Sequence, residues 1–374
     1  MGGSMRGITQ LFLGLFIIAL VSPGHAADTV EIAAIYALTG EAAEANAPSV
    51  QGVRIGVDEI NEHGGILGMK VDLKMLDNQS TPIGSHLAAQ RAADSGAVAI
   101  IGAAWSSHSL PMAEVAQIRG IPMISSFSTH PQVTKTGNYV FRVCFTDDFQ
   151  GAALARFARE DLKAATASIF VNLTSEYSIG LSQIFQKHFE QLGGKVVYVA
   201  EYKSKQKDFD QQIQGARKAQ ADLLFLSGHD ESGLLAKQAQ EKGVQSIAIG
   251  GDGWAEPSFM AKGGDQLKRA YYCSHWSEAI DSKPSRHFVA RYKDLPNFGA
   301  GMALAYDAVM VLGEAIRRAG SPERSKIRNA LAETHNFEGV TGLISFDGQG
   351  DPVKSVVIME IREGKPVYLK TLNP

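Results

Sequence analysis

The sequence has little cysteine: only Cys144 and Cys273 occur in 374 residues. Two thiols are too few for the four-ligand metal sites that cysteines build. In an exported protein the pair could form a disulfide. Two small residues, each buried on its own, would explain them equally well. The sequence therefore leaves their pairing open.

The chain also lacks a strong charge of one sign. Its 36 Lys and Arg residues against 39 Asp and Glu residues give a net charge of −3. Proteins that bind nucleic acids carry a basic field that neutralises phosphates, so we expect no nucleic-acid partner. The hydrophobic content of 45% is ordinary for a globular protein, and the length predicts two domains.

Motifs of common catalytic sites are missing. There is no G-x-S-x-G nucleophile elbow, no H-E-x-x-H and no P-loop. Ser106 and His108 lie close in sequence, but no third member of a catalytic triad is evident. The adjacent residues His229, Asp230 and Glu231 fit the start of a helix better than one metal ion. We expect a protein that is not an enzyme and that needs no metal or cofactor.

No apolar run is long enough to span a bilayer, which takes ~20 residues. The run at residues 11–21 is shorter, follows Arg6, and is followed by small residues up to Ala26. This pattern predicts a secretory signal peptide over residues 1–26, cleaved near Ala26, and hence a soluble, exported protein. An uncleaved membrane anchor is the alternative. No cysteine follows the run, so we expect no lipid anchor.

What the sequence does contain is a regular alternation of apolar strands and amphipathic helices. In the first part we expect strands at residues 30–38, 70–76, 97–101 and 121–125, and helices at residues 48–61, 82–93 and 110–117. In the second part we expect strands at residues 167–171, 195–201, 221–226 and 246–249, and helices at residues 179–191, 209–219 and 231–242. Such alternation predicts an α/β fold with two doubly wound parallel sheets.

The C-terminal part follows a different order. Helical patterns at residues 285–293, 302–319 and 324–333 come first, and strand patterns at residues 340–346, 353–361 and 367–370 follow. We expect these elements to pack back onto the two sheets rather than to form a third domain.

The segment 97–109 has the pattern of a strand, a tight loop and the start of a helix. Free backbone N–H groups at such a terminus attract anions. Ser106, Ser107 and Ser109 add hydroxyl groups there. Serine is also a preferred helix cap, so the same residues are explained by capping alone. The hypothesis that this loop holds a ligand carboxylate depends on the other loops.

In an open α/β sheet, ligands bind beyond the carboxyl ends of the strands. The loops at those ends carry hydroxyl, acidic and aromatic side chains. The candidate ligand-binding residues are Trp105, Ser106, Ser107, Phe127, Thr129, Tyr177, His229, Asp252 and Trp254. This mixture suits a zwitterion with an apolar side chain. Each residue alone could instead have an ordinary structural role in its loop.

Several short motifs occur in order along the chain. They are Leu38-Thr39-Gly40, Gly52, Asp58-Glu59-Ile60-Asn61, Gly64-Gly65-Ile66-Leu67-Gly68, Ile101-Gly102 with Ser106-Ser107, Gly120-Ile121-Pro122, Phe141-Arg142 and Gly251-Asp252-Gly253-Trp254. With them, the chain from about Val30 onwards resembles the periplasmic substrate-binding proteins of branched-chain amino acid ABC transporters, the leucine/isoleucine/valine-binding type.

The resemblance implies two Rossmann-like lobes that are joined by a three-strand hinge and enclose a ligand cleft, a type I periplasmic binding protein fold. It places residues 27–145 and 274–342 in the N-terminal lobe, and residues 146–273 and 343–374 in the C-terminal lobe. The three crossovers fall near residues 144–149, 273–277 and 343–347. Both cysteines would then lie on crossovers.

The resemblance also assigns roles to individual residues. Ser106 and Thr129 would meet the α-carboxylate of an amino acid, and the carbonyl of Phe127 would accept from its ammonium group. Tyr177 would close over the ligand from the second lobe, and Asp252 would pair with the ammonium group.

Three positions depart from the family pattern. Ala45 stands where other members have an aromatic residue, and His229 stands near the place of a tyrosine. Trp105 is bulkier than usual beside the serine. We therefore expect a reshaped side-chain pocket.

These inferences predict a monomeric extracytoplasmic binding protein without enzymatic activity. It would capture a branched-chain or other hydrophobic or aromatic amino acid by hinge closure and deliver it to the membrane permease of an ABC transporter. The alternative is a protein that binds an aromatic carboxylate or an amide, for uptake or for sensing.

Overall fold

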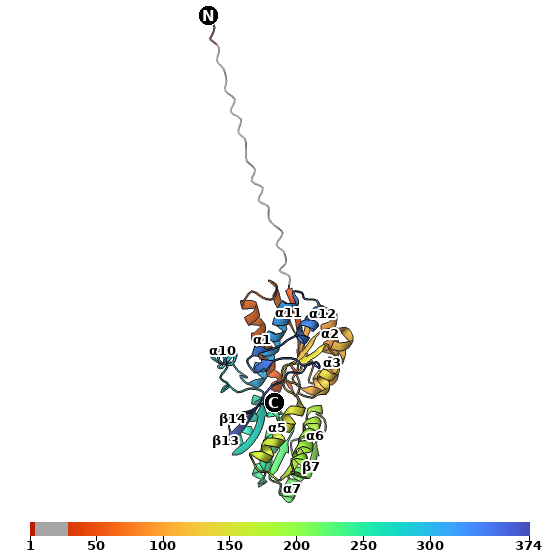
Figure 1. The fold of residues 1–374 in the computed structure, drawn as a ribbon, viewed down its shortest axis with the longest axis vertical. Helices are drawn as coiled ribbons and strands as arrows, with labels where there is room; N and C mark the ends of the chain where they lie inside the picture. The colour runs from red at the N-terminus through yellow and green to blue at the C-terminus, as the bar shows by residue number, and fades with distance from the viewer. Residues whose placement is uncertain (4–28) are drawn as a thin grey trace.

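The computed structural model describes residues 1–3 and 29–374. The predicted signal peptide, residues 1–26, falls almost entirely outside these residues. Within the described part of the chain, no helix is both long and apolar enough to cross a membrane. The described residues form two lobes, one above the other in Figure 1, and each lobe is built on its own sheet.

The sheet of the first lobe has five parallel strands in the order β2-β1-β3-β4-β5. The strands are β1 (Thr29–Tyr36), β2 (Lys70–Asp77), β3 (Ala99–Gly102), β4 (Met123–Ser125) and β5 (Val140–Arg142). One face is covered by α1 (Ala43–Glu62), α11 (Ala300–Ala319) and α12 (Arg324–Ala332), and the other by α2 (Pro82–Ser95) and α3 (Ser106–Arg119). This arrangement confirms the predicted doubly wound sheet.

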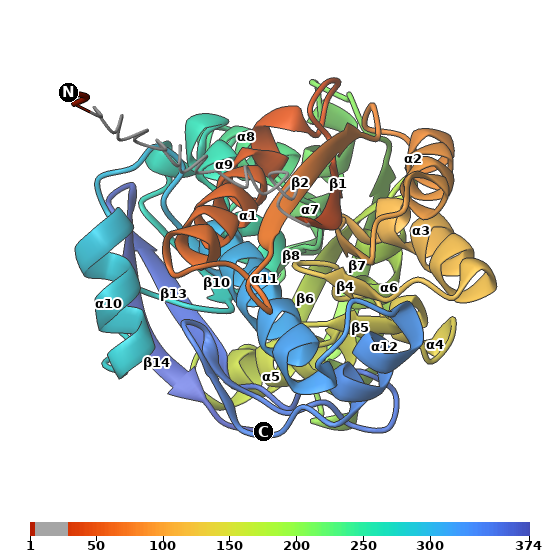
Figure 2. The ribbon, with the colours of Figure 1, turned by 90° about the horizontal axis from the view of Figure 1, so that it is seen from above.

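Local sequence signals define these helices. Thr81 caps α2, Pro82 begins it, and Gly96 ends it in the left-handed conformation. α11 is apolar on nearly all sides and is buried along most of its length. It packs tightly on α1 because Gly52 has no side chain: a Cβ atom there would lie 2.2 Å from the carbonyl oxygen of Met302. Figure 2 shows the two helices close together.

The sheet of the second lobe has seven strands in the order β14-β13-β10-β9-β8-β6-β7. The strands are β6 (Thr166–Asn172), β7 (Lys195–Tyr202), β8 (Leu223–Leu226), β9 (Ile247–Gly250), β10 (Arg269–Ser274), β13 (Val356–Arg362) and β14 (Lys365–Leu372). The strands β7, β6, β8, β9 and β10 are parallel, whereas the edge pairs β10–β13 and β13–β14 are antiparallel.

Helices also cover both faces of the second sheet. α5 (Asp147–Glu160) and α6 (Glu176–Gln191) pack on one face, and α7 (Asp210–Ala219) and α8 (Glu231–Glu241) on the other. The predicted fold class is therefore confirmed for this lobe as well. After β9 the chain continues into a 3₁₀ helix, η1 (Asp252–Trp254), the short α9 (Pro257–Ala261), and a second 3₁₀ helix, η2 (Gly264–Gln266).

The chain passes between the two sheets in three segments. These are residues 143–146 after β5, residues 275–282 between β10 and α10 (Lys283–Tyr292), and residues 345–355 between β12 (Gly342–Ile344) and β13. We call them the first, second and third connecting segments. α10 packs against α11 of the first lobe, while β13 and β14 extend the second sheet.

Several segments differ from the prediction, because β5, β10 and α9 form at positions where no strand or helix was expected. α5 was not predicted, although Thr146 caps it and the exposed Asp148 places a negative charge in its first turn. The single strand predicted at residues 340–346 is wrong, because the chain forms a hairpin of β11 (Phe337–Gly339) and β12. Gly342 takes a φ of 106°, and the buried Asp307 carboxylate accepts the N–H groups of Val340 and Thr341 at the turn.

Both cysteines are free thiols. The Cys144 Sγ donates to the carbonyl oxygen of Ser128 at 3.3 Å, and the Cys273 Sγ donates to Gln150 Oε1 at 3.1 Å. Each thiol is buried in the hydrophobic core of a different lobe. In the structure the two cysteines are therefore not paired in a disulfide, a point that the sequence leaves open.

Candidate functional site

The N-terminus of α3 lies at the junction of the two lobes. The Ser106 Oγ is buried and accepts the backbone N–H of His130 at 3.2 Å. The Ser107 Oγ accepts the N–H of Glu176, the first residue of α6 in the other lobe, at 3.3 Å. The cap position belongs to Trp105, whose side chain makes no capping bond. Capping therefore does not account for these two serine hydroxyls, which contact other loops.

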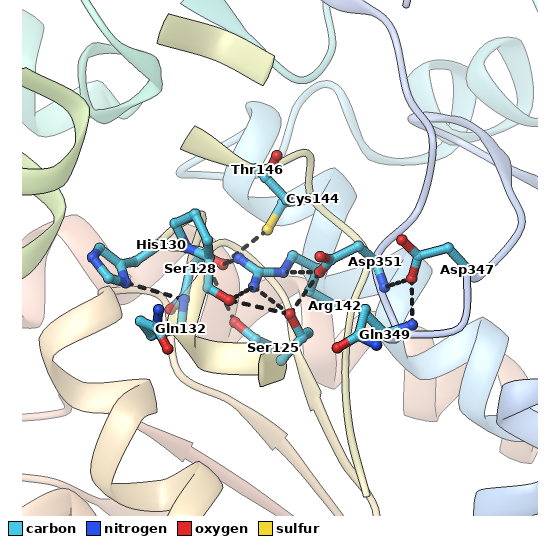
Figure 3. A network of polar contacts seen from close by, with 12 residues as sticks. Ser125, Ser128, His130, Gln132, Arg142, Cys144, Thr146, Asp347, Gln349 and Asp351 are labelled. Carbon is cyan, nitrogen blue, oxygen red and sulfur yellow. Dashed lines mark hydrogen bonds and ion pairs between the residues drawn. The ribbon is translucent and has the colours of Figure 1, made fainter. Parts of the chain in front are cut away.

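A buried arginine holds the loop that follows β4 (Figure 3). The Arg142 Nη1 donates to the carbonyl oxygen of Ser128 at 2.7 Å, and its Nε donates to Asp351 Oδ1 at 2.6 Å. Asp351 belongs to the third connecting segment. Phe127 and Thr129 flank Ser128, so Arg142 positions both candidate residues and ties their loop to that segment.

Three aromatic rings stack across the lobe junction. The imidazole of His229 lies 4.3 Å from the indole of Trp105, with 4° between the planes, and 4.7 Å from the ring of Tyr177. Burial lowers the pKa of His229, so the ring is neutral near pH 7. The Tyr177 hydroxyl accepts the N–H of Gly253 at 3.2 Å. The stack therefore joins Trp105 of the first lobe to the first turn of α6 and to the His229 loop of the second.

Asp252 is paired with a histidine that the sequence analysis did not select. Its Oδ2 lies 2.8 Å from the Nε2 of His275 in the second connecting segment. Burial lowers the pKa of His275, and the Asp252 carboxylate opposes that shift. The His275 ring stacks on Phe145 at 3.6 Å and meets Phe127 edge-on at 5.0 Å. The Oδ1 of Asp252 is buried and makes no hydrogen bond.

Two more buried carboxyl groups lie near Asp252. Burial and the Asp252 charge raise the pKa of Asp147 to about 8, and they raise that of Glu256 to about 8 as well. The Asp147 Oδ1 accepts from the Gln150 side chain at 2.6 Å, whereas its Oδ2 has no partner. This concentration of acidic groups favours a ligand with a positive charge. Among residues 1–3 and 29–374, no cluster of three or more His, Cys, Asp or Glu residues is arranged to hold a metal ion.

A small cavity lies between the lobes, with about 10 Å³ of space for the centre of a water molecule. Its walls come from both lobes and are formed by Ala45, Ser49, Ala104, Trp105, Phe127, His229, Gly253 and Glu256. A wider pocket of about 350 Å³ also borders Trp105, and its wall includes Lys205, which lies 3.4 Å from Glu41 of the opposite lobe. The narrow inner cavity has room for about one water, not for an amino acid.

The structure brings most of the predicted residues together. Trp105, Phe127 and His229 line the cavity, and Tyr177 and Asp252 adjoin it through His229 and Gly253. The remaining first-lobe candidates, Ser106, Ser107 and Thr129, lie at the same junction. The Thr129 carbonyl oxygen accepts the N–H of Asp147 at the start of α5, at 2.8 Å.

Trp254 is not brought to this cavity. Its ring is buried in the core of the second lobe, 4.4 Å from Phe259, and only 1% of the residue is exposed. It packs over Gly250, where a Cβ atom would meet the indole.

Two residues of the site, Glu256 and His275, were not predicted from the sequence. Glu256 precedes Pro257 in the same loop as Asp252, and an acidic residue at this position could have been selected as a candidate from the sequence. His275 carries no motif, and only the packing of the second connecting segment against Asp252 identifies it.

Two α/β lobes whose loops enclose a cavity between them define a two-lobed ligand-binding protein. The family model described as periplasmic binding protein matches residues 29–366, so the chain belongs to the periplasmic binding protein family. The chain is 28% identical over 358 residues to the leucine-, isoleucine-, valine-, threonine- and alanine-binding protein of Pseudomonas aeruginosa, covering 93% of this chain and 94% of that protein. It is 30% identical over 339 residues to the Leu/Ile/Val-binding protein BraC3 of Rhizobium johnstonii, covering 89% and 91%.

The chain also resembles solved structures of binding proteins. The leucine-binding protein LivK of Thermotoga maritima superposes with a TM-score of 0.88 at 35% identity, covering 92% of this chain and 99% of that one. The substrate-binding protein LivJ of Streptococcus pneumoniae, in complex with isoleucine, gives 0.86 at 27% identity, covering 93% and 100%. A Rhodopseudomonas palustris protein bound to 3,4-dihydroxybenzoic acid shares the fold at 20% identity, with a TM-score of 0.82 and coverage of 92% and 97%.

Proposed function

We propose that this protein binds an amino acid between its lobes and delivers it to the membrane permease of an ABC transporter. The relatives that carry leucine, isoleucine and valine in their names support this assignment and make branched-chain amino acids the first ligands to test. In this proposal the protein is a periplasmic monomer, and its signal peptide is cleaved near Ala26. It has no enzymatic activity and no nucleic-acid partner.

The observation that carries the proposal is the environment of Asp252. One of its carboxylate oxygens is bonded to His275, and the other is buried without a partner. An unpaired buried carboxylate oxygen is costly, and an ammonium group would satisfy it. The N-terminus of α3, with Ser106, suits the carboxylate of the same molecule. Together the two sites would clamp a zwitterion from opposite lobes.

Lobe motion follows from the size of the cavity. Because an amino acid does not fit the space between the lobes, the lobes must part for entry. The moving bodies in this proposal are residues 27–145 with 274–342 and residues 146–273 with 343–374. The three connecting segments would supply the hinge.

Isothermal titration of the purified protein with the common amino acids tests the proposal. At least one should bind with a micromolar or lower Kd. Asp252→Asn keeps the volume and removes the charge, so it should weaken that binding by roughly 10- to 100-fold. Asp148→Asn, a change at an exposed neighbour of Asp147, is the matched control.

A different outcome identifies the alternative. If no amino acid binds, and benzoate or a hydroxybenzoate binds equally to the parent protein and to Asp252→Asn, the ligand is an aromatic carboxylate. In that case the assignment of Asp252 to an ammonium group is wrong.

A further inference from the structure

Glu256 is a buried carboxyl group beside the first turn of α11, where the backbone N–H of Gly301 is a donor near it. Only 7% of the residue is exposed, and neither Oε1 nor Oε2 makes a hydrogen bond. It lies just beyond η1 and directly before α9, in the loop that also carries Asp252. A carboxyl group in such a place costs stability unless something pairs with it. Packing alone does not explain an acid here, because an apolar residue would fill the space without that cost.

Glu256 lines the cavity, whereas Asp252 adjoins it from a different position. Asp252 is bonded to His275, whose ring lies against Phe145 and Phe127. Glu256 lies on the other side, toward α1 and α11, where a Cβ atom on Gly301 would come within 2.5 Å of its Oε1. The two acids thus face different ends of the space between the lobes.

The wall opposite Glu256 is small and partly polar. It comes from α1, through Ala45 and Ser49, and both residues line the cavity. The Ser49 Oγ lies 3.5 Å from the carbonyl oxygen of Gly301. When the lobes part, a ligand that reaches this wall would place its far end next to Glu256.

We propose that Glu256 selects amino acids whose side chain ends in N–H donors, an ammonium or an amide group. This inference depends on the proposed function, which assigns Asp252 to the α-ammonium group of the ligand. A branched apolar side chain in the same place would leave both Glu256 oxygens buried and unpaired. An N–H donor would satisfy at least one of them.

Electrostatics agree with this assignment. Burial, together with the charge on Asp252, raises the pKa of Glu256 to about 8, while the nearby N–H of Gly301 acts in the opposite direction. Near pH 7 the carboxyl group therefore carries a proton for most of the time. A cationic side chain stabilises the ionised form, so its binding should release that proton.

Isosteric pairs of amino acids provide the test. Ornithine matches norleucine in size, and glutamine matches glutamate, but only the first member of each pair ends in a neutral or cationic N–H donor. In titrations at pH 7 the donor member of at least one pair should bind more tightly by on the order of tenfold or more. Glu256→Leu should abolish that preference. Glu256→Gln should remove the preference for ornithine and keep that for glutamine.

Controls separate recognition from misfolding. Glu241→Gln changes an exposed acid of α8 and should leave every affinity unchanged. Glu256→Leu removes an unpaired buried acid, so its Tm should be equal to or above that of the parent protein. Ornithine binding measured in buffers of different ionisation enthalpy should show proton release in the parent protein and none in Glu256→Gln.

The outcomes distinguish the two proposals. If norleucine and glutamate bind at least as well as ornithine and glutamine, or if the preference survives in Glu256→Leu, the role of Glu256 is overturned. Leucine binding that depends on Asp252 would then leave the proposed function intact. If no amino acid binds at all, both proposals fail.

Discussion

The indole of Trp105 and the imidazole of His229 lie parallel within 4°, with 4.3 Å between the ring centroids. The two residues come from different lobes, and Tyr177 packs on the far face of the imidazole. Because burial keeps His229 neutral, the stack depends on aromatic packing rather than on charge. It is a direct contact of the closed arrangement and should be lost when the lobes part.

Trp105→Ala should weaken ligand binding by roughly tenfold, since an aromatic pair contributes about 0.5–1.5 kcal/mol beyond the area it buries. Trp105→Phe keeps a ring and should lose less. Titration calorimetry measures both effects. Equal affinities for the two variants and the parent protein would show that the stack does not stabilise closure.

Arg142→Met should lower the free energy of unfolding by about 3 kcal/mol, because it leaves Asp351 and the Ser128 carbonyl without their buried donor. It should also weaken binding, since the loop with Phe127 loses its anchor. Arg119→Met is the control, because Arg119 pairs with Asp94 on the surface and such pairs contribute at most about 1 kcal/mol. Urea unfolding of both variants gives the comparison. Similar losses in the two would contradict the role given to Arg142.

Asp147 should make stability depend on pH in a particular direction. Its pKa is about 8 in the folded chain and about 4 when unfolded, so the folded state binds the extra proton between those values. The contribution of protonated Asp147 to the free energy of unfolding is therefore complete below pH 4 and is lost as the pH rises to 8. Asp147→Asn stays neutral, so the stability of the parent protein relative to this variant should fall between pH 5 and pH 8. Asp148→Asn should show no such trend in thermal unfolding without ligand, and a flat difference for Asp147→Asn would refute the assignment.

The two thiols should be unreactive in the native protein. Burial raises the pKa of Cys144 to about 12 and that of Cys273 well above its usual range, so neither forms a thiolate near pH 7. A thiol reagent should titrate no thiol in the folded protein and two in the chain unfolded without reductant. An unfolded chain with no titratable thiol would mean that a disulfide links the pair.

Much of the fold could be predicted from periodicity, because many strands are short apolar or alternating runs that end at a turn residue. The strands expected at residues 70–76 and 167–171 match β2 and β6 to within one residue at each end. The hairpin of β11 and β12 could not be predicted in the same way. Its turn depends on Asp307 in α11, which is remote in sequence and accepts the N–H groups of Val340 and Thr341.

The candidate site could be predicted only where the position of a loop relative to the sheet indicates which residues meet. Loops at the carboxyl ends of strands identified Trp105, His229 and Asp252 because the sheet topology brings those ends together. Trp254 has the same sequence context, yet its side chain turns into the core beneath Gly250. The orientation of a side chain within a loop depends on packing, and a single sequence does not contain it.

The packing of α1 on α11 limits when the first lobe can fold during synthesis of the chain. Ser49 and Gly301, which are in contact through a hydrogen bond, are 252 positions apart, so the apolar face of α1 has no partner until the ribosome has synthesised most of the chain. The first lobe cannot complete its core before then, because α11 fills the centre of one of its two faces. The first lobe therefore depends on α11 for its core, which is compatible with export of the chain before that lobe is complete.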